Sequence, residues 1–200
     1  MRTRIIVPHR GLAAAKTRLA PILDPDEREA LARQLLERVL RVARQAYSDV
    51  VVISPSVALA AVVEPLGARL VVQRGMGLNT GLDQARSDAL FDFIDTLAVL
   101  HGDLPILQVE DIHTLLGALP ADGSPGVAIG PDRNGTGTNA LALQPPGVIN
   151  FRFGRGSFAK HVAEVERAGV PLVVVDRAGL GFDLDTPEDF ARWRALGDAA

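Results

Sequence analysis

Asp103 stands where a buried strand is predicted to end, and its carboxylate is the first candidate for chemistry in this chain. The apolar segment 97–100 before it is typical of a strand buried on both faces of a parallel sheet. Gly102 lets the backbone turn, and Pro105 cannot continue a sheet ladder. Open α/β sheets bind ligands at the carboxyl ends of their strands, so Asp103 is predicted to face a ligand. The alternative is that Asp103 only caps the following loop or helix.

Two more carboxylates, Asp183 and Asp185, stand late in the chain. Thr186 and Pro187 directly after them predict a helix start, with Thr186 as the N-cap and Pro187 as the first helical residue. In an extended segment the two aspartates point to one side, where like charges repel unless a cation lies between them. Together with Asp103 they form a candidate cation site, and the alternative is a pair of solvent-exposed acids.

The loop after a predicted strand at 4–8 carries a cluster of cations. Arg10, Lys16 and Arg18, helped by backbone N–H groups, are predicted to bind nucleotide phosphates there. Lys16 is one of only two lysines among 21 basic side chains. The loop lacks the Gly-Lys-Ser/Thr ending of a Walker A sequence, and the alternative is a solvated basic loop.

Two glycine-rich segments, 132–139 and 152–157, indicate further anion contacts. The first offers N–H and hydroxyl donors, although an ordinary surface turn has the same composition. In the second, Ser157 begins a predicted helix after Gly154 and Gly156 and beside arginines. Exposed N–H groups at a helix amino end attract phosphate or carboxylate groups. Without these neighbours Ser157 would be an ordinary N-cap.

A further glycine-rich turn at 75–82 leads into a helix that is predicted to begin near Asn79. Glycines allow close approach of the backbone to a ligand, so the turn is predicted to hold a base or ribose with Asn79 as its polar contact. The alternative is that Asn79 is only the N-cap of the helix.

Carboxylates together with phosphate-binding loops favour Mg²⁺ and a nucleoside triphosphate. A hard cation that bridges carboxylates and phosphate oxygens offsets the charge that develops on a leaving pyrophosphate. The protein must then only align an attacking phosphate oxygen with the α-phosphorus. Lys16 and Asp103 are the predicted catalytic residues of this transfer. The chain has no Ser-His-Asp signature with a nucleophile elbow and no His-x-x-His pair.

The elements that must position these residues alternate between strand and helix. This order predicts a mostly parallel, doubly wound α/β sheet in a single domain over residues 1–200. The predicted strands span 4–8, 49–54, 68–72, 97–100, 127–131, 140–143 and 170–175. The predicted helices span 26–46, 56–66, 109–118 and 157–168, with others that start near 79 and 187.

The composition excludes several classes of function. A net charge of -3 gives no reason to expect nucleic acid or an anionic membrane as a partner. The absence of cysteine excludes disulfides, thiolate metal sites and cysteine nucleophiles. The first residues show no signal-peptide pattern and no apolar run reaches membrane-spanning length, so a cytoplasmic protein is expected.

Motifs along nearly the whole chain resemble the CofC/FbiD family, whose members are 2-phospho-L-lactate or phosphoenolpyruvate guanylyltransferases of coenzyme F-420 biosynthesis. The Gly-Thr-Gly-Thr-Asn and Phe-Gly-x-Gly-Ser-Phe motifs are specific to that family. The Gly-Asp-x-Pro motif is shared by many nucleotidyltransferases of the same glycosyltransferase-A-like fold. In chain order the motifs lie at 15–19, 102–105, 131–141, 153–158 with His161, and 183–189.

The resemblance implies that GMP passes from GTP to a small phosphorylated acid, with release of pyrophosphate. The acid would be 2-phospho-L-lactate, phosphoenolpyruvate or 3-phosphoglycerate. The first loop departs from the family pattern, because Arg10 stands near the strand end where relatives usually carry a lysine; an arginine binds phosphates with a different fork geometry. The site residues that the resemblance implies are Thr138, Gly154 and Ser157 for the acid, Asp103, Asp183 and Asp185 for Mg²⁺, Lys16 and Arg18 for the triphosphate, and Ser54 and Asn79 near the nucleoside.

Three other functions stay open from the sequence. They are a nucleotidyltransferase for molybdopterin or a sugar phosphate, a glycosyltransferase with 183–185 as its metal motif, and a nucleotide-binding protein without catalysis. The small acceptor segments at 135–139 and 152–157 favour a compact acid over a pterin, and the late position of 183–185 counts against a glycosyltransferase. The oligomeric state also stays open, with a homodimer among the states to test.

Overall fold

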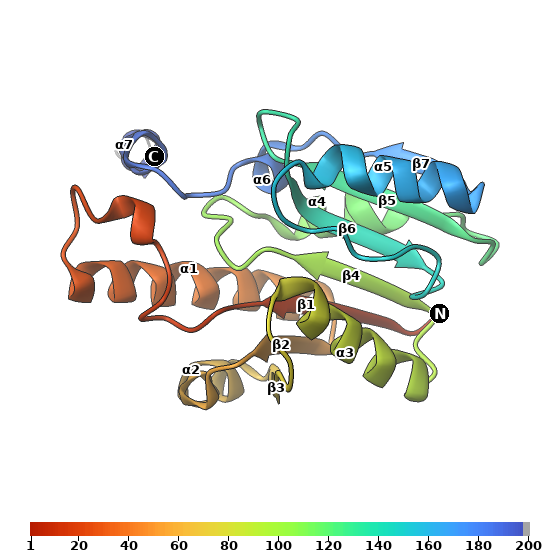
Figure 1. Ribbon diagram of the computed structural model, residues 1–200, viewed down its shortest axis with the longest axis horizontal. Coiled ribbons are helices and arrows are strands. Elements are labelled where there is room, and N and C mark those ends of the chain that lie inside the picture. The colour runs from red at the N-terminus through yellow and green to blue at the C-terminus, as the bar shows by residue number, and fades with distance from the viewer. Residues whose placement is uncertain (198–200) are drawn as a thin grey trace.

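Seven strands form one sheet in the computed structural model, which describes residues 1–197 (Figure 1). The strand order is β3-β2-β1-β4-β6-β5-β7, and only β6 runs antiparallel to its neighbours. This architecture confirms the predicted mostly parallel α/β sheet. The strands are β1 Thr3–Pro8, β2 Val50–Ser54, β3 Arg69–Val72, β4 Thr96–Leu100, β5 Gly126–Pro131, β6 Thr138–Gln144 and β7 Leu172–Val174.

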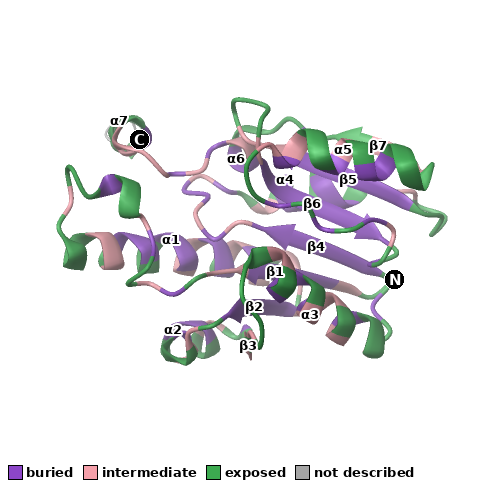
Figure 2. Cartoon of the chain, in the orientation of Figure 1, coloured by how far each residue is buried: buried purple, intermediate pink, exposed green. Residues whose placement is uncertain are grey.

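Helices cover both faces of the sheet because alternate strand residues point to opposite sides. Ile5 and Val7 of β1 pack with α1, α2, α4 and α6, whereas Ile6 packs with α3 and α5. In Figure 2 the inner strands are buried, and each long helix shows a buried and an exposed side; the edge strands β3 and β7 are intermediate or exposed. The helices are α1 Pro25–Ala46, α2 Ala60–Val63, α3 Leu78–Phe91, α4 Val109–Gly117, α5 Ser157–Ala168, α6 Ala178–Gly181 and α7 Pro187–Gly197, with 3-10 turns at Thr17–Leu19, Val57–Leu59 and Glu64–Leu66.

The predicted helix over 56–66 is wrong in its continuity, because the segment divides into α2 and two 3-10 turns. Pro65 explains part of the break, since proline has no N–H for the helical hydrogen bond. No helix within residues 1–197 is both long and apolar enough to cross a membrane. The single-domain prediction over 1–200 stays a prediction, and its last three residues lie outside the described range.

The register of β1 against β4 brings two functional loops together. Ile6 pairs with Val99 in parallel, so the chain emerges after Pro8 and after Leu100 at the same edge of the sheet. A small apolar cluster of Leu19, Leu31, Leu35 and Leu184 joins the first loop, α1 and the segment before α7 at this edge. In Figure 1, α7 lies at the far side of the molecule from the N-terminus, beyond the carboxyl ends of β1 and β4.

Candidate active site

A cleft of about 640 Å³ opens at the carboxyl ends of β1 and β4. It brings together the first loop, the loop after β2, the start of α3 and the segment after β4, as expected for an open α/β sheet. Five of the residues predicted to bind the nucleotide or the metal line it: Arg10, Lys16, Arg18, Asp103 and Asp185.

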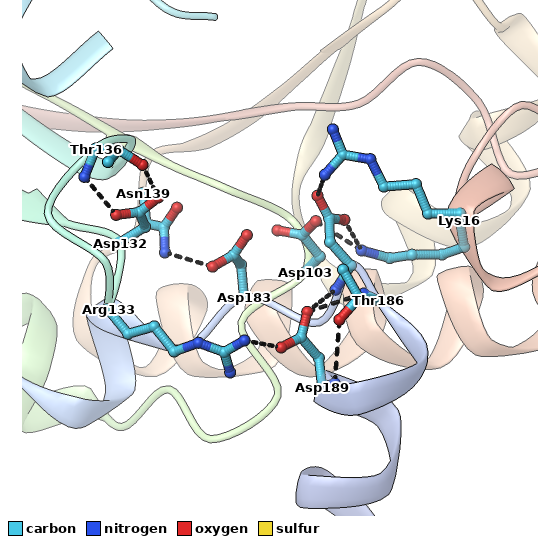
Figure 3. Close-up of polar contacts among 11 residues, drawn as sticks. Lys16, Asp103, Asp132, Arg133, Thr136, Asn139, Asp183, Thr186 and Asp189 are labelled. Atoms are coloured by element: carbon cyan, nitrogen blue, oxygen red, sulfur yellow. Dashed lines mark hydrogen bonds and ion pairs between the residues drawn. The ribbon is translucent and has the colours of Figure 1, made fainter. Parts of the chain in front are cut away.

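Lys16 is the central cation of the cleft. Its Nζ donates to Asp103 Oδ2 at 2.6 Å and to Asp185 Oδ1 at 3.1 Å (Figure 3). The Lys16 side chain is only 5 % exposed, and its backbone is left-handed, with φ of 55°. Burial alone would lower the pKa of Lys16, but the two carboxylates outweigh it and raise the pKa. Lys16 is therefore held as a charged ammonium between two acids.

One carboxylate oxygen of Asp103 has no hydrogen-bond partner among the described residues. Burial disfavours its charged form, but Lys16, with smaller contributions from His101 and His9, lowers the pKa of Asp103. Its Oδ1 is buried and has no hydrogen-bond partner within residues 1–197. A buried carboxylate oxygen without a partner is costly, so this atom is a candidate ligand for a cation or substrate group.

Asp183 is a second candidate ligand for a cation. Burial raises the pKa of Asp183, and the nearby charge of Asp103 raises it further. In Figure 3 Asp103 lies between Asp183 and Lys16. Two acids that destabilise each other fit a bound divalent cation, because the ion would neutralise both. Asn139 donates to Asp183 Oδ1 at 3.2 Å and orients this carboxylate.

The structure does not assemble the three predicted aspartates into one cluster. Asp185 contacts Lys16 and lies 3.8 Å from Arg18 Nη1, so cations of the first loop neutralise it. Within residues 1–197 no three acid or histidine side chains lie at the spacing that a metal ion needs. Mg²⁺ binding by Asp103, Asp183 and Asp185 therefore stays a prediction, and in this arrangement Asp103 and Asp183 are the two of the three that Lys16 and Arg18 do not both neutralise.

The segment 183–185 is fixed to the rest of the site by its backbone and by α7. The Leu184 N–H donates to the Asp103 carbonyl at 3.1 Å, which ties the acids of the two segments together. The Asp189 carboxylate accepts the Thr186 N–H at 2.8 Å, and Thr186 Oγ1 accepts the Asp189 N–H at 3.3 Å, so the predicted capping interaction is confirmed. Asp189 also pairs with Arg133, which links α7 to the 132–139 loop.

Thr138 and Ser157, both predicted to hold the acid, meet around a buried histidine. Thr138 begins β6 and its Oγ1 lies 3.0 Å from His161 Nδ1. Ser157 is 2 % exposed and lies one helical turn before His161 on α5. Gly156 is the N-cap of α5 and Ser157 is its first residue, so the N-cap alternative for Ser157 is wrong. Gly154 is exposed, with φ of +116°, in the turn before α5.

Asn79 and Ser54 lie outside the cleft lining. The Asn79 amide brackets the backbone of Phe153: its Nδ2 donates to the carbonyl at 3.1 Å and its Oδ1 accepts the N–H at 2.9 Å. The N-cap of α3 is Gly77, so Asn79 does not fill that role either. Ser54 is fully buried, and its hydroxyl accepts the Ser56 N–H at 3.0 Å. Both polar side chains bond the protein backbone, and their place near a nucleoside stays a prediction.

Asn79→Ala is expected to lower the free energy of unfolding by about 1–3 kcal/mol. The alanine leaves the N–H and carbonyl of Phe153 without partners at the base of the 152–157 loop. Chemical denaturation measures the change. Asp88→Ala, a change on the same helix with no cross-loop bond, is the control. Equal free energies of unfolding for the two variants would contradict a stabilising role of the Asn79–Phe153 hydrogen bonds.

Two histidines of the cleft were missed by sequence reasoning. His9 directly follows β1, and its Nδ1 accepts the Gly11 N–H at 3.0 Å. His101 directly follows β4, and its buried Nε2 has no hydrogen-bond partner within residues 1–197. Both positions follow the rule that singled out Asp103, because each comes next after a buried parallel strand.

The burial of His9 and His161 predicts that the protein loses stability in mild acid. Burial lowers the pKa of each to about 4, from an ordinary value of about 6.5. The unfolded chain takes up these protons near pH 6.5 and the folded chain only near pH 4, so the free energy of unfolding falls as the pH drops through this window. Denaturant titrations across it should show the fall, and the fall should be shallower in His161→Asn. A flat profile between these pH values would contradict the burial of two neutral imidazoles.

Known proteins resemble this chain over nearly its whole length. A family model described as "Guanylyl transferase CofC like" matches residues 3–198. A phosphoenolpyruvate guanylyltransferase of Sphaerobacter thermophilus is 43% identical over 192 residues, which cover 94% of this chain and 91% of the relative. A 2-phospho-L-lactate guanylyltransferase of Methanothermobacter thermautotrophicus is 35% identical over 191 residues, which cover 94% and 82%.

Solved structures share the fold at lower identity. A protein of Desulfovibrio desulfuricans G20 described as a nucleotide-diphospho-sugar transferase aligns with a TM-score of 0.78 at 20% identity, covering 95% of this chain and 85% of that one. A CMP:2-keto-3-deoxy-manno-octonic acid synthetase aligns with a TM-score of 0.65 at 17% identity, covering 100% and 99%. These likenesses confirm the nucleotidyltransferase fold predicted from the sequence. With the family model and the close relatives, they place this chain in the CofC-like guanylyltransferase family.

Proposed function

We propose that this protein transfers GMP from GTP to a small phosphorylated acid and releases pyrophosphate. The observation that carries the proposal is the buried Lys16 ammonium beside Asp103, whose second oxygen has no hydrogen-bond partner within residues 1–197; both residues line a cleft of about 640 Å³. Relatives over nearly the full length of the chain are named for this transfer to phosphoenolpyruvate or 2-phospho-L-lactate.

The nucleotide side of the reaction fits the first loop. Arg10, Lys16 and Arg18 line the cleft and supply three positive charges for a triphosphate. His9 adds a neutral ring whose Nδ1 is already occupied by the Gly11 N–H, so its Nε2–H is free to donate to a phosphate oxygen. Mg²⁺ held by Asp103 and Asp183 would neutralise phosphate charge when bound.

The acid side of the reaction fits the small residues at the amino end of α5. Thr138 begins β6 and Ser157 begins α5 after the turn with Gly154, and the Phe158 N–H links the two segments by donating to the Thr136 carbonyl at 3.2 Å. The amino end of α5 favours an anion there. Phosphoenolpyruvate is the first acid to test, with 2-phospho-L-lactate and 3-phosphoglycerate beside it, and the product would serve the biosynthesis of coenzyme F-420.

The reaction needs no covalent enzyme intermediate. A phosphate oxygen of the acid attacks the α-phosphorus of GTP and forms a new P–O–P bond. The bond from the α-phosphorus to the bridging oxygen breaks, and pyrophosphate leaves with the electron pair. The residues of this chain hold the two phosphates in line and offset their charge, which is the main protein contribution to phosphoryl and nucleotidyl transfer.

A pyrophosphate-release assay with purified protein, GTP and Mg²⁺ tests the proposal. We expect release only when a phosphorylated three-carbon acid is added, and the three acids are compared side by side. Glucose 1-phosphate serves as the sugar-phosphate control, and CTP and ATP replace GTP in parallel reactions. Release without any acceptor, or with the sugar phosphate alone, would reject the proposal.

A further inference from the structure

His161 is a fully buried histidine beside the proposed acid site. Its exposed fraction is 0%, and it lies on α5 one turn after Ser157. The Phe153 ring packs edge-on against it, with ring centroids 4.8 Å apart. An imidazole buried this deeply costs free energy unless both ring nitrogens have partners. Its hydrogen bonds therefore define what the side chain can do.

Those hydrogen bonds determine which ring nitrogen carries the proton. The backbone N–H of Arg152 donates to His161 Nε2 at 2.9 Å, so Nε2 must be unprotonated. Burial lowers the pKa of His161 to about 4, and the ring is neutral at pH 7 with its single proton on Nδ1. Nδ1 lies 3.0 Å from Thr138 Oγ1, which must accept this proton. In the other tautomer the proton on Nε2 would face the Arg152 N–H, and two donors would repel each other.

The same bond decides the direction of the Thr138 hydroxyl. Because Oγ1 accepts from His161, the hydroxyl proton has to point away from the ring. Thr138 is only 1 % exposed, and within residues 1–197 its hydroxyl forms no other hydrogen bond, so this proton has no protein acceptor. Thr138 pairs with Pro131 of β5, where the register of β5 against β6 shifts between Gly130 and Pro131.

We propose that His161 is a positioning residue that holds the Thr138 hydroxyl as a donor toward an oxygen of the phosphorylated acid. The proposal rests on the proposed function, in which Thr138 contacts that acid. His161 touches the acid only through Thr138 and is not part of the cleft that lines the nucleotide side. Its loss should therefore raise the KM for the acid and leave the KM for GTP nearly unchanged.

The tautomer is tested first, without any substrate. Long-range ¹H–¹⁵N NMR of the ¹⁵N-labelled protein at neutral pH distinguishes a protonated from an unprotonated ring nitrogen. We expect one histidine with a protonated Nδ1 and an unprotonated Nε2, whose signals vanish in His161→Asn. A protonated Nε2 at His161 would overturn the inference even if the protein proves to be a guanylyltransferase.

Two variants then distinguish the role of Nδ1 from that of Nε2 in the His161 ring. His161→Gln can still reach the Arg152 N–H but loses the donor to Thr138, whereas His161→Asn keeps a donor close to the place of Nδ1. With GTP and phosphoenolpyruvate, His161→Gln should raise the acid KM by about tenfold or more, and His161→Asn should restore most of the loss. In a Thr138→Val background, His161→Gln should have no further effect on the acid KM, because the hydroxyl that His161 directs is gone.

The controls make each outcome decisive. His113→Gln, at an exposed histidine on α4, should leave all kinetic constants unchanged. Circular dichroism melting identifies a variant that fails to fold, and the NMR result on the unaltered protein then decides. Additive losses in the double variant, or equal rises of the KM for GTP and for the acid, would overturn the proposal. No turnover by the unaltered protein with any acid would refute the proposed function instead, while the tautomer still tests the His161–Thr138 pair.

Discussion

Asp103→Asn is expected to lower the rate of pyrophosphate release by about 10³-fold, because metal-assisted charge stabilisation of this kind contributes several kcal/mol to the transition state. Asp103 has one oxygen on Lys16 and a second, buried oxygen without a partner within residues 1–197. The amide has the same size but no negative charge for a cation. It also replaces one acceptor oxygen by an N–H₂ donor. Steady-state release from GTP with phosphoenolpyruvate measures the loss.

The control for this variant is another aspartate changed in the same way. Asp122→Asn alters an exposed loop acid whose carboxylate bonds only Ser124 within residues 1–197, and its rate should be unchanged. Asp103→Asn weakens the hold on Lys16, so its melting temperature is expected to fall by some degrees and assays belong well below that transition. A rate close to that of the unaltered protein would contradict the role of Asp103.

Asp183→Asn is expected to make the protein more stable and much less active. Burial and the charge of Asp103 raise the pKa of Asp183, so its ionised form destabilises the fold. The neutral amide removes this repulsion, and its carbonyl oxygen can still accept from Asn139. We expect the rate of pyrophosphate release to fall by roughly 10²–10³-fold, because a cation would lose one of its two carboxylates.

The pH dependence of the stability gain tests its electrostatic cause. A carboxyl whose folded pKa is raised destabilises the fold above that pKa and has no such effect when protonated in both states. The melting temperature of Asp183→Asn should therefore exceed that of the unaltered protein near pH 7, and the two should converge as the pH falls below about 4. A lower melting temperature at neutral pH would contradict the repulsion, and an unchanged rate would remove Asp183 from the cation site.

The sequence predicts the sheet and the edge that holds the site, because both follow from local patterns. Apolar runs at 50–54 and 97–100 are long enough to mark buried strands, and the position of Asp103 after such a run places it in the cleft. Lys16 is predicted from its loop and its rarity. The same reasoning applies to His9 and His101, which occupy the equivalent positions after their strands.

Side-chain partners across the chain are not visible in local patterns. Asn79 bonds Phe153, 74 residues further on, and a polar residue near a helix start gives no sign of such a partner. Asp185 stands two residues after Asp183, a spacing that suggested a shared ligand for the two acids. In the structure Asp185 instead accepts a hydrogen bond from Lys16 of the first loop. The three-carboxylate cluster was inferred from spacing alone; in the structure Lys16, 169 residues away, bonds Asp185, and Mg²⁺ binding by these aspartates stays a prediction.

Phosphorus NMR of one reaction tests the central claim most directly. Purified protein is mixed with GTP, Mg²⁺ and phosphoenolpyruvate, and the phosphorus signals are followed to completion. The account predicts that GTP and the acid disappear together and that pyrophosphate and a product with two coupled, linked phosphorus atoms appear in equal amounts. Formation of GDP and inorganic phosphate with the acid left unchanged would contradict it.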